Sequence, residues 1–541
     1  MKSKFQHKLL VAFLVATVAM GCKKLDLTPT DRFSDASFWA VDANVYNALN
    51  NNYSLIYNSN IFFYNESTSD NAYSSTGDYV LIASGNGNSS QGKFLNDWTY
   101  YYSTIKSCNV FLANVDVNKT LAPEVIARLK AEVRFIRAFE HFNLAKWYGD
   151  VPLIDKDISA DEAKVIARSP KAQVMEFVIT ELKAAAVALP SKDQIPASEN
   201  GRITNGAALA LLARVLLYEG NRMAEVAEIC EQLMTNQTTN GQYSLVANYS
   251  TLFSDPSINK TNNEAILSLQ YVPAIRTWNE FFDFAPRSVG GRVSGMSPTQ
   301  ELVDDYITLN GKGIKESGSG YVEANPYINR DPRLTATVVY DRYNWQNADG
   351  STKVIYIEPG TDPNPSRLDE YSPSSQASSP TGYYWRKYFD PIALNSFSSG
   401  LNIHLIRYAE VLLTYAEAKQ ALGQMDATVW NNTIGALRQR AGFTDAAALN
   451  YPGAANMTNI IRRERRAELA MEGLRTDDIR RWKIGETTLN GFAHGAQFGD
   501  IAVDNGYIRA QRRTFTDKDY LWPIPSSEIG LNPNLTQNPG Y

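Results

Sequence analysis

The densest group of side chains that could carry chemistry lies toward the C-terminal end, where arginines alternate with carboxylates. Glu464, Glu468 and Glu472 recur at intervals of four residues, so on a helix they share one face. Paired carboxylates can serve as general acid and base in glycoside hydrolysis when the pKa of one is raised. Here every acid has an arginine neighbour, as in the run 462–466, and a nearby guanidinium lowers a carboxyl pKa. We therefore predict a structural arginine–carboxylate network that joins two helices.

Other catalytic arrangements are missing from the sequence. There is no serine nucleophile elbow, phosphate-binding loop or dinucleotide fingerprint. The four histidines are scattered without metal-ligand spacing: His7, His141, His404 and His494. We expect a binding protein that is not an enzyme and has no metal site or cofactor, with only a structural calcium ion left open. A pair of glycosidase carboxylates elsewhere remains the catalytic alternative.

Aromatic residues are abundant, with 30 Tyr, 22 Phe and 9 Trp. Flat rings can cover the apolar face of a sugar, and nearby polar side chains can bond its hydroxyl groups. Three segments combine both kinds of side chain, and the first runs from Asp70 through Tyr79 to Tyr100 and Tyr101. For any single ring, ordinary core packing is the more frequent role. The candidate ligand-binding residues are Asp70, Asn71, Tyr73, Trp98 and Tyr101 in the first segment, Trp278 and Phe281 in the second, and Tyr384 and Trp385 in the third.

Helical periodicity dominates two blocks, at about 41–234 and about 401–483. The first aromatic segment lies in the first block, and the other two lie between the blocks. The clearest helix begins at Pro123, whose fixed φ suits a first helical position, and ends at Gly149. At 1.5 Å per residue this helix would be a rod of about 39 Å. Between the blocks, the sequence is rich in Gly, Pro, Ser and Asn, which favours long loops with a few short strands.

An internal repeat indicates how the helices pair. Small residues let neighbouring helices approach closely, and glycine supplies the positive φ of the turn between them. We predict a mostly α fold in which about four degenerate tetratricopeptide-like hairpins form a scaffold with long irregular loops. The matching positions are Leu209, Ala213, Gly220 and Ala224 in one copy and Leu412, Ala416, Gly423 and Ala427 in the other.

The first residues have the pattern of an export signal. Three early lysines precede an apolar stretch, 9–20, and a small residue, Gly21, comes directly before Cys22. This predicts a lipoprotein signal peptide at 1–21 with Cys22 as the acylated first residue and 23–29 as a tether; an ordinary signal with an incidental cysteine is the alternative. Each buried methylene of an acyl chain contributes about 0.8 kcal/mol, so two or three chains anchor a protein firmly.

The remaining cysteines and the net charge further limit the kinds of site and partner that the protein can have. Cys108 and Cys230 lie inside helical patterns, so we expect buried free thiols, with one disulfide between them left open. The net charge of −5 includes three signal lysines, so the mature chain would carry −8. Since no basic block is present, nucleic acid is not expected as a partner.

Ordered motifs along the whole chain resemble those of the SusD-like (RagB/SusD) family of nutrient-binding outer-membrane lipoproteins. Singly each motif is modest, but their order is specific. They lie at 27–29 (LTP), 37–39 (SFW), 132–138 (EVRFIRA), 147–153 (WYGDVPL), 330–334 (RDPRL), 406–413 (IRYAEVLL), 416–418 (AEA), 464–469 (ERRAEL), 478–482 (DIRRW), 521–525 (LWPIP) and 537–541 (QNPGY).

This resemblance implies a single domain over 22–541, with a helical part at about 22–240, a loop-rich part at about 241–400 and a helical and irregular part at about 401–541. It implies a lipid-anchored protein of the outer membrane that faces the exterior. Such a protein would bind a glycan or oligosaccharide and act, without catalysis, as a hinged lid on a TonB-dependent, SusC-like transporter. The same role for peptides or another oligomeric nutrient is the alternative, and a surface glycoside hydrolase is a more distant one.

Overall fold

The computed structural model describes residues 35–292, 295–374, 378–393 and 397–541. The predicted signal peptide, Cys22 and the tether 23–29 therefore lie outside the described residues.

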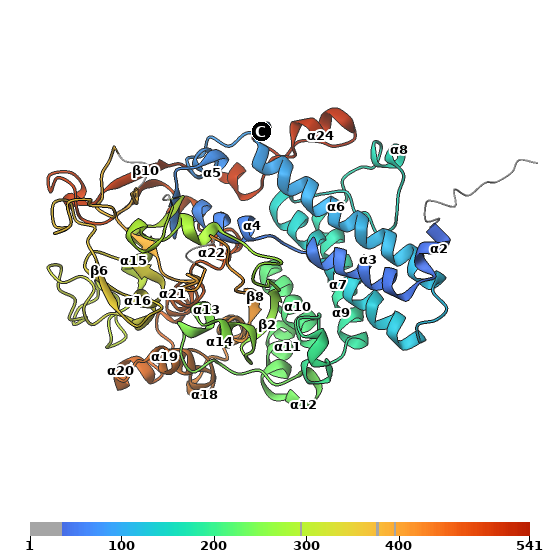
Figure 1. The fold of residues 1–541 in the computed structure, drawn as a ribbon, viewed down its shortest axis with the longest axis horizontal. Coiled ribbons are helices and arrows are strands. Elements are labelled where there is room, and N and C mark those ends of the chain that lie inside the picture. Colours follow the sequence, from blue (N-terminus) through green and yellow to red (C-terminus); the bar gives the residue numbers. More distant parts are fainter. Residues whose placement is uncertain (1–34, 293–294, 375–377, 394–396) are drawn as a thin grey trace, which may run out of the picture.

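Long helices pack side by side in chain order and form most of one side of the molecule (Figure 1). Helix α6 packs on α7, α7 on α9, α9 on α10 and α10 on α11, and the row continues through α17 to α21. The bounds of these helices and of α2 and α3, which cover α6, are α2 Asp35–Trp39, α3 Asp42–Ser54, α6 Gly92–Asn114, α7 Pro123–Tyr148, α9 Lys171–Ala188, α10 Asn205–Glu219, α11 Met223–Thr235, α17 Tyr408–Ala421 and α21 Met457–Leu469.

Local signals fix the ends of these helices. Helix α7 has Pro123 in its first turn and ends at Gly149, where φ is +75°, as predicted. The two glycines of the internal repeat also adopt positive φ, +75° at Gly220 after α10 and +68° at Gly423 after α17. A residue with a Cβ atom is disfavoured in this conformation, whereas glycine is not. The sequence therefore located both inter-helix turns correctly.

Short helices and irregular segments form the other side of the molecule (Figure 1). The short helices are α4 Ser59–Tyr64, α5 Gly77–Ala83, α8 Ala160–Ala163, α12 Gln237–Asn240, α13 Thr251–Ser254, α14 Pro256–Lys260, α15 Gln300–Asp305, α16 Pro332–Thr337, α18 Ala427–Trp430, α19 Ala436–Ala441, α20 Ala446–Leu449, α22 Arg475–Arg481, α23 Gly485–Thr488 and α24 Ser526–Leu531.

The strands of the described residues form five antiparallel two-stranded ladders. The ladder of β2 and β8 packs against α10 of the helical row, with Ala265 opposite Arg407 and Leu269 opposite Ile403, and every residue of β8 is buried. Mostly helical structure with a few short strands confirms the predicted fold class. The strands are β1 Ala72–Ser74, β2 Ala265–Leu269, β3 Met296–Pro298, β4 Val338–Val339, β5 Tyr343–Gln346, β6 Thr352–Ile355, β7 Tyr384–Trp385, β8 Ile403–Arg407, β9 Gly491–His494 and β10 Arg509–Arg513.

One continuous hydrophobic core reaches from Trp39 in α2 to Leu535 near the C-terminus. Within it, the indole rings of Trp147 and Trp522 stack with their centroids 4.1 Å apart. Cys108 and Cys230 are buried and free, and burial raises the pKa of both thiols far above its usual range. Both therefore act as small apolar residues, which agrees with the expectation of free thiols. Within the described ranges, no helix combines the length and apolarity that crossing a membrane requires.

Candidate ligand-binding site

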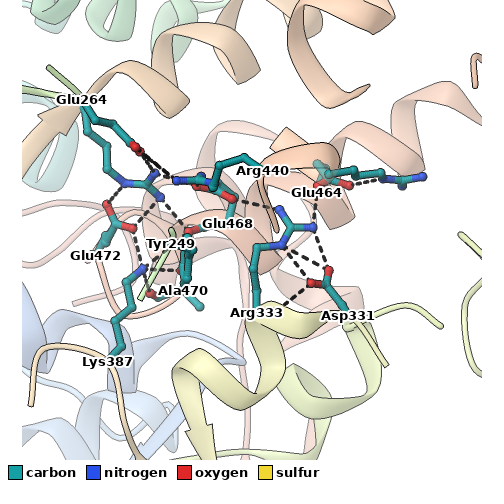
Figure 2. A network of polar contacts seen from close by, with 12 residues as sticks. Tyr249, Glu264, Asp331, Arg333, Lys387, Arg440, Glu464, Glu468, Ala470 and Glu472 are labelled. Carbon is teal, nitrogen blue, oxygen red and sulfur yellow. Dashed lines mark hydrogen bonds and ion pairs between the residues drawn. The ribbon is translucent and has the colours of Figure 1, made fainter. Parts of the chain in front are cut away.

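The glutamates considered for catalysis lie in a buried network of ion pairs (Figure 2). Glu468 on α21 contacts Arg333 at 2.9 Å and Arg407 at 2.6 Å, and it also bonds Arg440. Glu464 pairs with Arg333, and Glu472 with Arg407. Burial alone would raise the pKa of these carboxyls, but the facing guanidinium groups outweigh it and lower the pKa of all three.

None of these three carboxyls can hold a proton at neutral pH, which a general acid requires. The prediction of a structural network is therefore confirmed. The network joins α21 to α16 and to β8, because Arg333 lies in α16 and Arg407 in β8. The part of the chain that the structure describes also holds no cluster of three potential metal ligands.

Asp70 and Asn71, the two polar candidates of the first aromatic segment, also form buried contacts with arginines. Asp70 accepts two hydrogen bonds from Arg475, at 2.7 and 2.9 Å, and pairs with Arg466 at 3.0 Å. Asn71 donates to Glu66 at 2.6 Å and accepts from Arg466 at 2.6 Å. Both side chains are buried. They connect the N-terminal part of the chain to α21 and α22, and they offer no free group to a ligand in this conformation.

Most candidate rings also lie inside the core. Trp98 packs edge-on against Tyr148 of α7, with centroids 5.1 Å apart, and the indole NH of Trp278 donates to the carbonyl of Leu401 at 2.7 Å. Tyr73 on β1 is the exception, because it is half-buried. The structure therefore does not support ligand contact through the other rings. Those buried rings are Trp98, Tyr101, Trp278, Phe281, Tyr384 and Trp385.

A cavity of about 490 Å³ opens beside the first aromatic segment, between α4, α5, α6 and residue Glu280. We call it the tyrosine pocket. Its rings are Tyr79 and Tyr100, both half-buried, which lie in the predicted segment but were not among the nine candidates. Side-chain amides and charged groups complete its wall. They are Asn58, Asn60, Asn96, Asp78, Lys93, Asp97 and Glu280.

Helix ends place the amides of the tyrosine pocket. Asn58 caps α4 by accepting the NH of Ile61 at 2.8 Å, which leaves Asn60 on the outer side of the first turn. On α6, Asn96 and Tyr100 are four residues apart and therefore share one face. Tyr79 of α5 stacks on Tyr64, with centroids 5.3 Å apart, so its ring is held in one orientation.

The charged groups of the tyrosine pocket are each held by a neighbour. Asp78 accepts the NH of Lys93 at 2.6 Å, and the ammonium group of Lys93 pairs with Asp97 at 2.5 Å. Burial lowers the pKa of Lys93 and raises that of Asp97. Glu280 accepts the hydroxyl of Ser59 at 2.7 Å. Three carboxyl groups face one ammonium group, so the wall disfavours anionic ligands.

The volume lies within the usual range for ligand sites, about 300–1,000 Å³. Fixed rings and side-chain amides suit a ligand that has both an apolar face and many hydroxyl groups. A helical scaffold that presents such a pocket, while its most clustered acids are locked in ion pairs, has the features of a binding protein.

Comparisons with known proteins give the family. Residues 230–541 match the model of the SusD family, and residues 25–217 match a model described as starch-binding associating with outer membrane. The chain belongs to the SusD family. Proteins of this family bind their ligands without catalysis, which confirms the prediction that the chain is not an enzyme.

Relatives match over nearly their whole length. A SusD-like protein, P2, from Formosa agariphila is 26% identical over 98% of this chain and 99% of its own. A SusD-like carbohydrate-binding protein from Bacteroides fragilis, known from its crystal structure, has a TM-score of 0.83 at 30% identity and covers 92% of this chain and 100% of its own. A laminarin-binding SusD-like protein has a TM-score of 0.68 at 22% identity and covers 92% of this chain and 99% of its own, a likeness of fold alone.

Proposed function

We propose that this protein is a surface lipoprotein that captures an uncharged glycan in the tyrosine pocket and passes it on uncleaved. The observation that carries the proposal is the pocket itself, in which Tyr79 and Tyr100 face side-chain amides. A family member of similar fold is described as carbohydrate-binding, and one matching family model as starch-binding. The excess of carboxyl groups in the wall favours neutral over anionic sugars.

Affinity gels and titration calorimetry with a panel of polysaccharides test this proposal. Neutral glucans, xylans and mannans should include a ligand, whereas polygalacturonate and alginate should bind more weakly because they are anionic. Tyr100→Ala removes a wall ring and should weaken binding about tenfold to a hundredfold, the loss expected for a hot-spot side chain. Thr99→Ala is the matched control, since Thr99 is exposed on α6 and does not line the pocket.

Three results would contradict the proposal. If wild-type protein retains no glycan of the panel, glycans are not its ligands. If the pure protein releases reducing ends, it hydrolyses the glycan and is not a binding protein alone. Equal affinity of Tyr100→Ala and Thr99→Ala would remove the tyrosine pocket as the site.

We further propose that residues 22–541 act as one outer-membrane lipoprotein domain that faces the exterior and is anchored through Cys22. The pattern of Gly21 and Cys22 and the family description, associating with outer membrane, support this. Cys22→Ala should move the protein from the membrane fraction to the soluble fraction. A Cys22→Ala protein that still sediments with membranes would contradict lipid anchoring.

The partner that receives the glycan would be a TonB-dependent, SusC-like transporter, over which this protein would act as a hinged lid. The family's resemblance supports this role. Copurification of a large outer-membrane protein with the tagged lipoprotein, in detergent, is the test. Recovery of the lipoprotein alone at native expression levels would count against the partnership.

A further inference from the structure

A second cavity, of about 360 Å³, lies on the same helix as the tyrosine pocket but toward its other end. We call it the amide groove. It is bounded by α2, α3 and the C-terminal half of α6. Its volume also lies within the range of about 300–1,000 Å³ that is usual for ligand sites. Its principal side chains are Phe38, Asn47, Asn51, Asn52, Ser107 and Val110.

Rings form the floor of the amide groove. Phe38 is half-buried and meets Trp39 edge-on at 5.3 Å. Trp39 in turn meets Phe111 edge-on at 5.6 Å, so three rings support one another. Phe38 is the ring whose surface remains partly open. An apolar surface of this kind can cover one face of a sugar ring.

Amides form the rim of the groove. Asn47 and Asn51 are exposed on consecutive turns of α3, and Asn51 donates to the hydroxyl of Ser107 at 3.2 Å. The side chain of Asn52 is 1% exposed, and its Oδ1 atom has no hydrogen-bond partner among the described residues. A buried acceptor without a partner costs free energy, which favours contact with a hydroxyl donor. Since this atom has less than 1 Å² of exposed surface, a donor in the groove would reach it only after the amide turns.

The groove differs from the tyrosine pocket in its charge. Among the described residues that line it, none carries an ionisable side chain. Uncharged amides, a hydroxyl and rings together recognise neutral polar molecules. Phosphates, sulfates and uronic acids would find no cation in this wall.

Both sites lie along one face of α6. Asn96 and Tyr100 line the tyrosine pocket, whereas Ser107 and Val110 line the amide groove; successive spacings of four, seven and three residues keep them on one side of a helix. The sites are centred about eleven residues apart, which is about 16 Å at 1.5 Å per residue. Helix α3 runs antiparallel along the same stretch, as the contacts of Asn51 with α6 and of Leu55 with Thr104 at 2.9 Å show.

We propose that the amide groove is a second saccharide-binding site, which holds a more distant part of the same neutral glycan. The class of ligand, a neutral glycan, is taken from the proposed function, whereas the position of the second site is taken from the geometry of the amide groove. When one chain occupies two sites, the second contact is intramolecular, so its effective concentration is high. The protein would therefore bind long oligosaccharides more tightly than short ones, although both fill the tyrosine pocket.

Calorimetry with short and long laminari- and malto-oligosaccharides tests the second site. Asn51→Ala and Phe38→Ala should weaken the binding of long chains about tenfold and leave the affinity for short chains unchanged. Asn50→Ala is the matched control, because Asn50 is an exposed residue of α3 outside the groove. On wild-type protein, hydrogen exchange should show protection of residues 38–54 and 104–111 by long chains and not by short ones.

The outcomes separate this inference from the proposed function. If wild type binds long and short chains equally, or if both groove variants match Asn50→Ala on long chains, the second site is refuted while the tyrosine pocket stands. Loss of all binding in Tyr100→Ala, including protection at 38–54, would also refute an independent contact. Failure of wild type to bind any neutral glycan would refute both proposals.

Discussion

The substitution Glu468→Gln tests whether the buried ion pairs stabilise the fold. Glu468 is fully buried and faces three guanidinium groups, of Arg333, Arg407 and Arg440. Removing one partner of a buried ion pair costs about 3–5 kcal/mol. Arg333 and Arg407 retain other carboxylates in the variant. We therefore expect a loss near the lower end, about 3 kcal/mol in the free energy of unfolding.

Denaturant unfolding at pH 7 measures this loss, with Glu316→Gln as the control. The pair of Glu316 and Arg463 has a similar length, 3.0 Å, but its side chains are 46% and 26% exposed, so we expect a loss below about 1 kcal/mol. A Glu468→Gln variant that loses no more than this control would refute the stabilising role of the network.

Acid should remove the difference between wild type and Glu468→Gln. The arginines outweigh burial and hold the pKa of Glu468 well below its usual range. A lowered folded-state pKa contributes stability above the unfolded pKa, about 4.3, and that stability is lost as pH falls toward the folded pKa. The two free energies of unfolding should therefore converge as pH falls below about 4. An unchanged gap at pH 3 and pH 7 would contradict the assigned ionisation state.

Three further substitutions test other parts of the fold. Burial raises the pKa of Glu140 well above its usual range, so its buried carboxyl favours the protonated form and lowers the stability of the fold as pH rises above about 4.3. Glu140→Gln should therefore unfold like wild type at pH 4 and be more stable than wild type at pH 9, and a loss of stability at both pH values would refute this. A hydrogen bond to Glu301 raises the pKa of His494, so the protonated imidazole stabilises β9 and β10 below about pH 6.5, and this stability is lost as pH rises through the folded pKa. Hydrogen exchange corrected for intrinsic rates should therefore show weaker protection of β9 and β10 at high pH in wild type but not in His494→Gln. Gly473 has φ of +72°, and a Cβ there would lie 2.7 Å from a backbone oxygen of Phe62; Gly473→Ala should lower the free energy of unfolding by more than about 1 kcal/mol, and an unchanged denaturation midpoint would contradict this.

The sequence predicted those parts of the fold that depend on local signals. Pro123 and Gly149 marked the ends of α7 because proline and glycine restrict or permit particular backbone conformations at a helix terminus. Glu468 was predicted to be paired because arginines stand near it in the sequence. Its actual partners, Arg333 and Arg407, lie far away in the chain, and the sequence could not assign them.

The ligand-binding residues were harder to predict, because burial decides them and burial is a long-range property. Trp98 and Tyr100 are two residues apart on α6, so they point about 200° apart around the helix axis. The packing of Tyr148 from α7 covers Trp98 and leaves Tyr100 at the pocket. Composition indicated aromatic recognition in this segment but could not choose between the two rings. The amide groove had a weak signal in Asn47 and Asn51, one turn apart on a helix.

The stacking of Trp522 on Trp147 has a consequence for biosynthesis. Trp522 lies 375 residues after Trp147. The carboxylate of Glu66 likewise accepts hydrogen bonds from the backbone amides of Met471 and Gly473, which lie more than 400 residues later in the chain. A nascent chain that has emerged only through residue 450 therefore lacks these partners of Trp147 and Glu66, and such distant contacts make folding slow. These two contacts can therefore form only after nearly the whole chain has been synthesised.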